Sequence, residues 1–151
     1  MMTAIRTILL AEDSENDIEL TLAALDAHRV ANEVVVARDG VEALDYLHAR
    51  GSFSGRPPGN PALILLDLKM PLVDGLQVLK EVKSDPHLRT IPVVVLTSSR
   101  EEQDLVRTYD LGVNAYVVKP VDFKDFMAAV STLGQFWAVV NEAPTSTGKP
   151  R

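Results

Sequence analysis

The sequence predicts an α/β protein with a doubly wound parallel sheet and helices on both faces. Several apolar runs are short and continuous, which is typical of strands buried on both faces of a parallel sheet. These runs alternate with helical patterns, so each strand should be joined to the next by a right-handed helical crossover. With 151 residues, the chain is long enough for one domain with a substantial core.

The predicted strands are apolar runs that end at polar or charged residues. They cover residues 6–12, 33–38, 62–67, 92–97 and 115–119. Four runs end at residues that could serve one site: Glu12-Asp13, Asp67, Thr97-Ser98 and Lys119-Pro120. Because ligands bind outside the carboxyl ends of strands in open parallel sheets, we expect these residues to share one pocket.

The predicted helices carry apolar residues three or four positions apart, which places them on one face. They cover residues 15–28, 41–49, 75–83, 100–111 and 123–141. We expect Ser14 to cap the first helix, with Asp17 three residues on, and Asp122 to cap the last. Gly112 is expected at a C′-like position after the fourth.

Two segments are predicted to be irregular. Residues 51–61 hold three prolines and three glycines and should form a loop. The polar residues 143–151 are expected to be a disordered tail, which leaves residues 1–142 as the folded domain.

Composition excludes several classes of function. The net charge of -6 argues against nonspecific nucleic-acid binding, which needs a basic surface. The absence of cysteine excludes disulfides, thiol nucleophiles and zinc–thiolate sites. No apolar stretch reaches 18 residues, so we expect no membrane span and a cytoplasmic protein.

The residues of the expected pocket suit a hard cation and a phosphoryl group. Three carboxylates would repel one another without a cation, and oxygen ligands with no histidine nearby favour Mg²⁺ over zinc or copper. An aspartate such as Asp67 can attack phosphorus to form an aspartyl-phosphate, while the metal and the Lys119 ammonium neutralise charge on the phosphoryl oxygens and Thr97 adds a hydroxyl to the set. Each residue alone has a simpler reading: a helix cap for Glu12-Asp13, a solvated strand end for Asp67, a surface lysine for Lys119. The Lys119–Pro120 bond at a strand end could be cis.

Five segments taken in order make the sequence similar to the receiver domain of bacterial two-component response regulators. They are ILLAEDSENDIEL, VARDGVEALDYL, LILLDLKMPLVDGLQVLKEVK, IPVVVLTSS and YDLGVNAYVVKPVD, and the resemblance runs from about Thr7 to Val140. It implies a flavodoxin-like sheet of order 2-1-3-4-5 and a phosphoacceptor signalling domain rather than an enzyme.

The resemblance also implies roles for individual residues. Asp67 would accept the phosphoryl group from a sensor histidine kinase. Thr97 and Lys119 would contact that phosphoryl group, and Thr97 and Tyr116 would form the conformational switch. The acidic pair and the acceptor would bind Mg²⁺, directly or through water, together with one carbonyl: Glu12, Asp13, Asp67 and Lys69.

A finer resemblance is to stand-alone receivers that partner bacterial phytochrome histidine kinases. It rests on loop 51–61, the AED start, the VVVLTSS strand and the QFW at 135–137. Lys69 is a departure, because a neutral side chain is more usual beside the acceptor. Its ammonium would screen the site and change the lifetime of the phosphorylated state.

Three other functions are compatible with parts of this pattern. A receiver can instead be a shuttle that passes phosphate to a histidine phosphotransfer protein. A flavodoxin-like FMN carrier would need an uncharged phosphate-binding loop, whereas AEDSEND would repel the phosphate. A phosphatase of the haloacid dehalogenase class would need a second acid two residues after the nucleophile, where this chain has Lys69.

The last helical pattern predicts a homodimer. An apolar stripe runs along it, and Phe136 and Val139 lie off that stripe, where an aromatic is costly to leave in water. In the family, the face made by the fourth helix, fifth strand and fifth helix often pairs receivers. We expect the dimer contacts at Tyr116, Phe136, Trp137 and Val139; the alternative is that this helix end packs on its own domain.

Overall fold

A five-stranded parallel sheet forms the centre of the molecule. The computed structural model describes residues 7–27, 33–113 and 115–132. The strands are β1 (Thr7–Ala11), β2 (Glu33–Ala37), β3 (Leu63–Asp67), β4 (Val93–Thr97) and β5 (Ala115–Val118). Their order is β2-β1-β3-β4-β5, and every neighbouring pair is parallel. The predicted fold class and strand order are confirmed.

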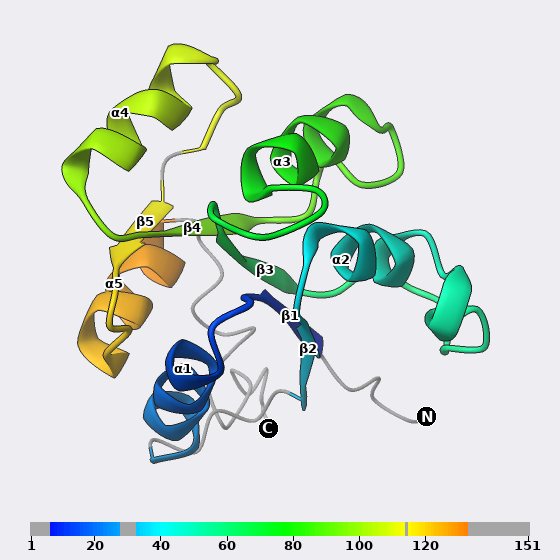
Figure 1. Cartoon of the computed structure of the whole chain (residues 1–151), viewed down its shortest axis with the longest axis horizontal. Helices are drawn as coiled ribbons and strands as arrows, with labels where there is room; N and C mark the ends of the chain where they lie inside the picture. Colours follow the sequence, from blue (N-terminus) through cyan, green and yellow to red (C-terminus); the bar gives the residue numbers. More distant parts are fainter. Residues whose placement is uncertain (1–6, 28–32, 114, 133–151) are drawn as a thin grey trace, which may run out of the picture.

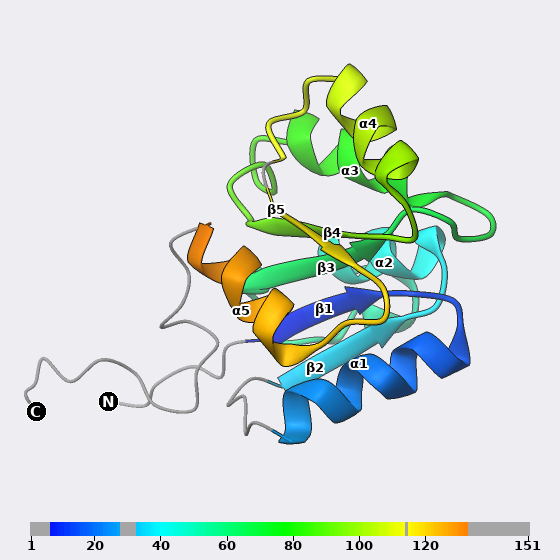
Figure 2. The ribbon, with the colours of Figure 1, turned by 90° about the vertical axis from the view of Figure 1, so that its left-hand side faces the viewer.

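Helices cover both faces of this sheet (Figures 1 and 2). They are α1 (Glu15–Ala27), α2 (Gly40–Leu47), α3 (Gly75–Ser84), α4 (Arg100–Thr108) and α5 (Phe123–Thr132), and a short 3₁₀ turn, η1, spans Gly51–Phe53. α1 and α5 lie on one face, and α2, α3 and α4 lie on the other. Among the described residues, no helix has the length and apolar character needed to cross a bilayer.

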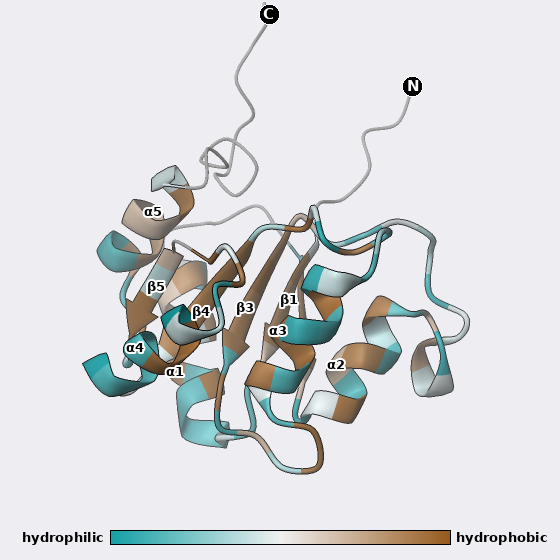
Figure 3. Cartoon of the chain, turned by 90° about the horizontal axis from the view of Figure 1, so that it is seen from above, coloured by the Kyte–Doolittle hydropathy of each residue, from teal (hydrophilic) through white to brown (hydrophobic). Residues whose placement is uncertain are grey.

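The strands form two apolar layers because successive side chains point to opposite faces. Ile8 and Leu10 of β1 pack with Phe126 of α5, while Leu9 of β1 packs with Leu79 of α3, on the other face. All five residues are fully buried. The strands are accordingly hydrophobic along most of their length (Figure 3), which explains their continuous apolar runs.

The predicted helix starts are confirmed. The Ser14 hydroxyl oxygen accepts a hydrogen bond from the Asp17 N–H at 3.2 Å. The Asp122 carboxylate accepts one from the Asp125 N–H at 2.8 Å. Both side chains satisfy an N–H that the first helical turn leaves without a partner.

The predicted end of the fourth helix is wrong. α4 stops at Thr108, three residues earlier than expected, and Tyr109 is its C-cap. The left-handed residue that follows is Asp110, with φ of 49°, and Gly112 adopts φ of 77° two residues later. An aspartate tolerates this conformation because its short polar side chain can hydrogen-bond locally. The last helix is described only to Thr132, so its predicted continuation to residue 141 lies outside the described residues.

The glycine- and proline-rich loop is fastened to α2 by Arg56. Its Nε donates to the Tyr46 carbonyl at 2.6 Å, and its guanidinium lies 4.4 Å from the centre of the Tyr46 ring. Phe53 meets the same ring edge-on at 5.2 Å between centroids. Apart from η1, the segment is irregular, as predicted.

Candidate functional site

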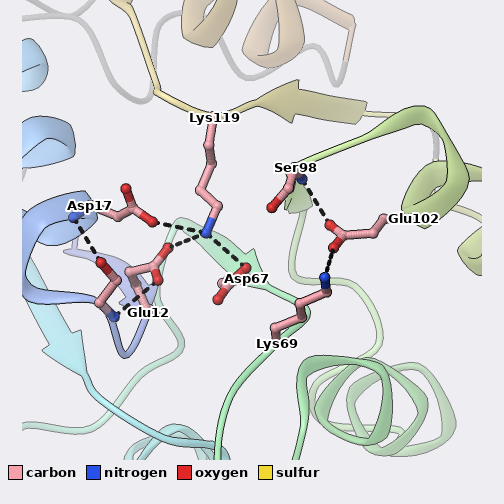
Figure 4. Close-up of polar contacts among 8 residues, drawn as sticks. Glu12, Asp17, Asp67, Lys69, Ser98, Glu102 and Lys119 are labelled. Carbon is pink, nitrogen blue, oxygen red and sulfur yellow. Dashed lines mark hydrogen bonds and ion pairs between the residues drawn. The ribbon is translucent and has the colours of Figure 1, made fainter.

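The polar ends of four strands meet at one edge of the sheet, as the sequence predicts (Figure 4). The Glu12 N–H donates to the Ala37 carbonyl at 2.9 Å, so β1 remains paired until it reaches its acidic end. Asp67 pairs in register with Leu96, next to Thr97. The Lys119 N–H donates to the Thr97 carbonyl at 2.8 Å.

The Lys119 ammonium is the centre of the site. Its Nζ lies 3.3 Å from Glu12 Oε1, 3.2 Å from Asp67 Oδ1 and 3.1 Å from Asp17 Oδ2. The Lys119–Pro120 peptide bond is cis, as the sequence suggested. Asp17 was not predicted as a site residue, although its spacing from Ser14 and its place in the first turn of α1 could have indicated it.

Three carboxylates form a cluster that can hold a cation. One oxygen each from Glu12, Asp13 and Asp67 lies within 4.8 Å of the others. Glu12 and Asp67 are buried, whereas Asp13 is exposed. With Asp17, four acids face the single ammonium of Lys119, so the pocket has an excess of negative charge. An all-oxygen donor set with that excess fits a hard divalent cation.

Burial perturbs the acids and the lysine of this pocket. It raises the pKa of Glu12 from 4.5 to about 7, with the charge of Asp67 as the second cause and with Ser14 and Lys119 opposing. Burial also raises the pKa of Asp67, against the opposing effect of Lys119. Burial alone would lower the pKa of Lys119, but the hydrogen bond to Asp17 and the neighbouring carboxylates raise it instead. Lys119 is therefore a fixed positive charge in the physiological range.

Two glycines hold the loop that follows Asp67. A Cβ on Gly75 would lie 2.1 Å from the Asp67 carbonyl oxygen, and one on Gly40 would lie 1.8 Å from the Val73 carbonyl oxygen. The Gly75 N–H also donates to the Leu68 carbonyl at 2.9 Å. The backbone of the acceptor strand is thus packed directly against the start of α3, which leaves no room for a side chain there.

Thr97 and Tyr116 lie on adjacent strands with different surroundings. Thr97 is fully buried, and its hydroxyl oxygen has no hydrogen-bond partner among the described residues. Tyr116 is partly exposed, its hydroxyl donates to the Val113 carbonyl at 3.3 Å, and the Arg107 guanidinium lies 4.9 Å from its ring centre. A buried, unpaired hydroxyl beside a charged pocket is a group available to an incoming ligand.

Of the predicted dimer residues, only Tyr116 belongs to the described part of the chain. Phe136, Trp137 and Val139 lie outside it.

The side chain of Lys69, another predicted site residue, turns towards α4, where its Nζ lies 3.1 Å from Glu102 Oε2. Glu102 was not predicted as part of any site.

Sequence comparison assigns the family. The family model described as the response regulator receiver domain matches residues 8–131, and the chain belongs to this family. Receiver domains are phosphoacceptor signalling domains of two-component systems. The response regulator Rcp1 from Synechocystis sp. is 41% identical over 132 residues, which cover 87% of this chain and 88% of Rcp1.

Solved structures agree with this assignment. The bacteriophytochrome response regulator AtBRR is 64% identical with a TM-score of 0.88, and the match covers 93% of this chain and 100% of AtBRR. The Mn²⁺-bound form of Rcp1 is 39% identical with a TM-score of 0.71, over 93% of this chain and 99% of Rcp1. The predicted resemblance to phytochrome-associated receivers is confirmed.

Proposed function

We propose that this receiver accepts a phosphoryl group on Asp67 from a sensor histidine kinase and transmits the signal by a change in conformation. One observation carries the proposal. The Asp67 carboxylate is buried, lies 3.2 Å from the Lys119 ammonium, and belongs to an oxygen-only cluster suited to a divalent cation. A nucleophile, a fixed positive charge and a metal-binding set at one point are the components that phosphoryl transfer requires.

Each side chain has a defined part in the transfer. An oxygen of the Asp67 carboxylate attacks phosphorus as the bond from phosphorus to the donor imidazole nitrogen breaks, and the electron pair of that bond stays on the imidazole. Lys119 stabilises the negative charge of the phosphoryl oxygens in the transition state. The carboxylates of Asp13 and Asp67 and the carbonyl of Lys69 would hold Mg²⁺, with Glu12 acting through water. When bound, Mg²⁺ supplies further positive charge at the phosphoryl oxygens.

The donor that we propose is a bacterial phytochrome histidine kinase. The support is similarity: AtBRR and RtBRR, which are 64% and 59% identical, are both named bacteriophytochrome response regulators.

We propose residues 1–142 as the limits of the domain, within which the family match covers 8–131.

We propose that the response is a two-state shift centred on Thr97 and Tyr116. A phosphoryl group on Asp67 would recruit the unpaired Thr97 hydroxyl, and Tyr116 would turn into the space that Thr97 leaves. Moving an equilibrium from 1:99 to 99:1 needs about 5.5 kcal/mol. Several charge-assisted hydrogen bonds of roughly 1.5–3 kcal/mol each would supply this.

We also propose that the signal passes through a homodimer. Exposed apolar side chains support a contact near β5: Val118 is 48% exposed, and Leu105 and Tyr109 of the α4 region are 48% and 45% exposed. Between β5 and α5 lies a hollow lined in part by Tyr116 and Val118. Phe136→Asp should shift the protein towards monomer in light scattering at micromolar concentration, and a wild type that stays monomeric with and without phosphorylation would favour the shuttle.

The central test is Asp67→Asn with acetyl phosphate and Mg²⁺. The amide is nearly isosteric but a poor nucleophile, so the variant should remain folded and take up no hydroxylamine-labile phosphate. Asp104→Asn is the matched control, because Asp104 is an exposed aspartate in α4 that pairs only loosely with Arg107, at 3.7 Å. Labile phosphate at the wild-type level on the Asp67 variant would overturn the assignment.

A further inference from the structure

Glu102 is a buried acid that the proposed phosphotransfer does not use. Its side chain is only 10% exposed and lies in the first turn of α4, beside the end of β4. Oε1 accepts a hydrogen bond from the Ser98 N–H at 2.8 Å, and Oε2 lies 3.1 Å from the Lys69 ammonium. One carboxylate therefore joins the residue after Thr97 to the second residue after Asp67.

Part of this arrangement is a helix cap. Ser99 is the N-cap of α4, and its hydroxyl oxygen accepts a hydrogen bond from the Glu102 N–H at 3.3 Å. In a capping box, the glutamate would reach back to the N–H of the cap residue. Here it reaches one residue further, to Ser98. Capping accounts for the α4 end of the contact, but it does not account for Lys69.

Lys69 could have remained in solvent. Its side chain is 76% exposed, and its ammonium is carried on a flexible four-carbon stem. Lys69 lies two residues after Asp67 in the chain, in the loop that follows β3. In Figure 4 the Lys69–Glu102 pair lies on the opposite side of Asp67 from Asp17. The Lys69 ammonium is thus near the acceptor but is held by a different anion.

We propose that the Glu102 carboxylate stands in for the phosphoryl group in the unphosphorylated domain. It occupies two donors beside the acceptor, the Lys69 ammonium and the Ser98 N–H, that a phosphoryl group on Asp67 would otherwise use. Phosphorylation then exchanges one anion for another: the phosphoryl oxygens take over Lys69 and Ser98, and Glu102 is released together with the first turn of α4. The inference rests on the proposed phosphorylation of Asp67 and gives α4 a direct mechanical link to it.

Glu102→Gln tests the exchange. The amide oxygen can still accept from Ser98, but the charge that holds Lys69 is lost. The rate of phosphorylation by acetyl phosphate with Mg²⁺ should rise about two- to fivefold, the range that a partly exposed ion pair supports. Glu101→Gln is the matched control, since Glu101 is exposed, lies in the same turn and loses the same charge. Glu101→Gln should change the phosphorylation rate only by the small amount that the loss of any nearby negative charge would cause.

Lys69→Met separates the exchange from capping. In the Lys69→Met variant the ion pair is already lost, so adding Glu102→Gln should not change the phosphorylation rate or the denaturation midpoint any further. The effects of the two substitutions should therefore be non-additive. The non-additivity in the denaturation midpoint should disappear when Asp67 is phosphorylated. In NMR spectra, the Ser98 amide signal should move on phosphorylation in the wild type.

The outcomes are distinct. Additive effects of the two substitutions, or a Glu102→Gln rate equal to that of Glu101→Gln, would reduce Glu102 to a helix cap and end this inference while leaving Asp67 as the acceptor. Non-additivity that persists unchanged after phosphorylation would also end it. A wild type that takes up no hydroxylamine-labile phosphate would overturn the proposed function and the inference with it.

Discussion

Glu12→Gln should remove most of a pH dependence of stability that the buried pocket creates. Burial raises the pKa of Glu12 from 4.5 to about 7 in the folded protein. Between these values the folded state holds a proton that the unfolded state has released. The free energy of unfolding should therefore fall as pH rises from about 4.5 to about 7 in the absence of metal, and then level off. The raised pKa of Asp67 acts in the same direction.

The magnitude follows from the size of that pKa change. A change from 4.5 to about 7 corresponds to about 3 kcal/mol, which is the upper limit of what Glu12 can cost at pH 8. Glutamine has no charge to desolvate. Its single amide oxygen can replace only one of the two carboxylate oxygens, which accept separately from Lys119 and from the Ser14 N–H. The variant should match the wild type near pH 4.5 and exceed its stability above pH 7 by up to that amount. Because the proposed Mg²⁺ site exists only in the folded state, saturating Mg²⁺ should restore stability to the wild type at neutral pH.

Urea denaturation followed by far-UV circular dichroism, with EDTA and at several pH values from 4.5 to 8, measures this directly. Glu19→Gln is the control, because Glu19 is exposed on α1 and loses the same charge. Parallel stability curves for the wild type and Glu12→Gln across this range would refute the argument, as they would show that Glu12 is ionised at no cost to the fold.

Three further predictions concern the metal, the switch and the loop behind the acceptor. Asp13→Ala should weaken Mg²⁺ binding at least about tenfold by calorimetry, because a direct carboxylate ligand is lost, while Glu19→Ala should not; equal affinities would argue against the metal site. Thr97→Ala should still accept phosphate but should lose most of the phosphorylation-induced spectral change, and a full-size change would refute the coupling. Gly75→Ala should lower the free energy of unfolding by about 1–3 kcal/mol and slow phosphorylation, because its Cβ would meet the acceptor's carbonyl at 2.1 Å. Gly55→Ala, with nothing within 4 Å, should do neither.

The sheet and most of the pocket could be predicted because they depend on local pattern. A continuous apolar run that ends at a polar residue marks both a buried strand and the edge where it stops. That pattern brought Glu12, Asp67, Thr97 and Lys119 to one place without any knowledge of contacts. The order of the strands came from resemblance to the receiver family, since periodicity alone does not fix it.

The remaining features depend on how side chains are oriented in the folded protein, which the sequence pattern does not specify. Asp17 was predicted only as part of a helix start, because its orientation towards Lys119 depends on how α1 crosses the sheet. Glu102 lies 33 positions after Lys69, and no spacing rule connects them. Arg56 reaches back to Tyr46 within a loop whose composition predicts irregularity but not the hydrogen bonds that order it.

The charges of the pocket explain why an additional cation matters after phosphorylation. Four carboxylates around one ammonium leave three negative charges in excess if all are ionised, and a bound Mg²⁺ would reduce that excess to one. Phosphorylation replaces the single charge of Asp67 with about two negative charges, so the excess rises again. Transfer of the Lys69 ammonium from Glu102 to the phosphoryl group would restore the earlier balance. The same step would remove the positive partner of Glu102, a buried acid in the first turn of α4. The charge that stabilises the phosphorylated site would thus be withdrawn from the helix turn that we propose is released. A receiver with a neutral residue at position 69 would lack this step, which is why the Lys69 substitution separates the two parts of the response.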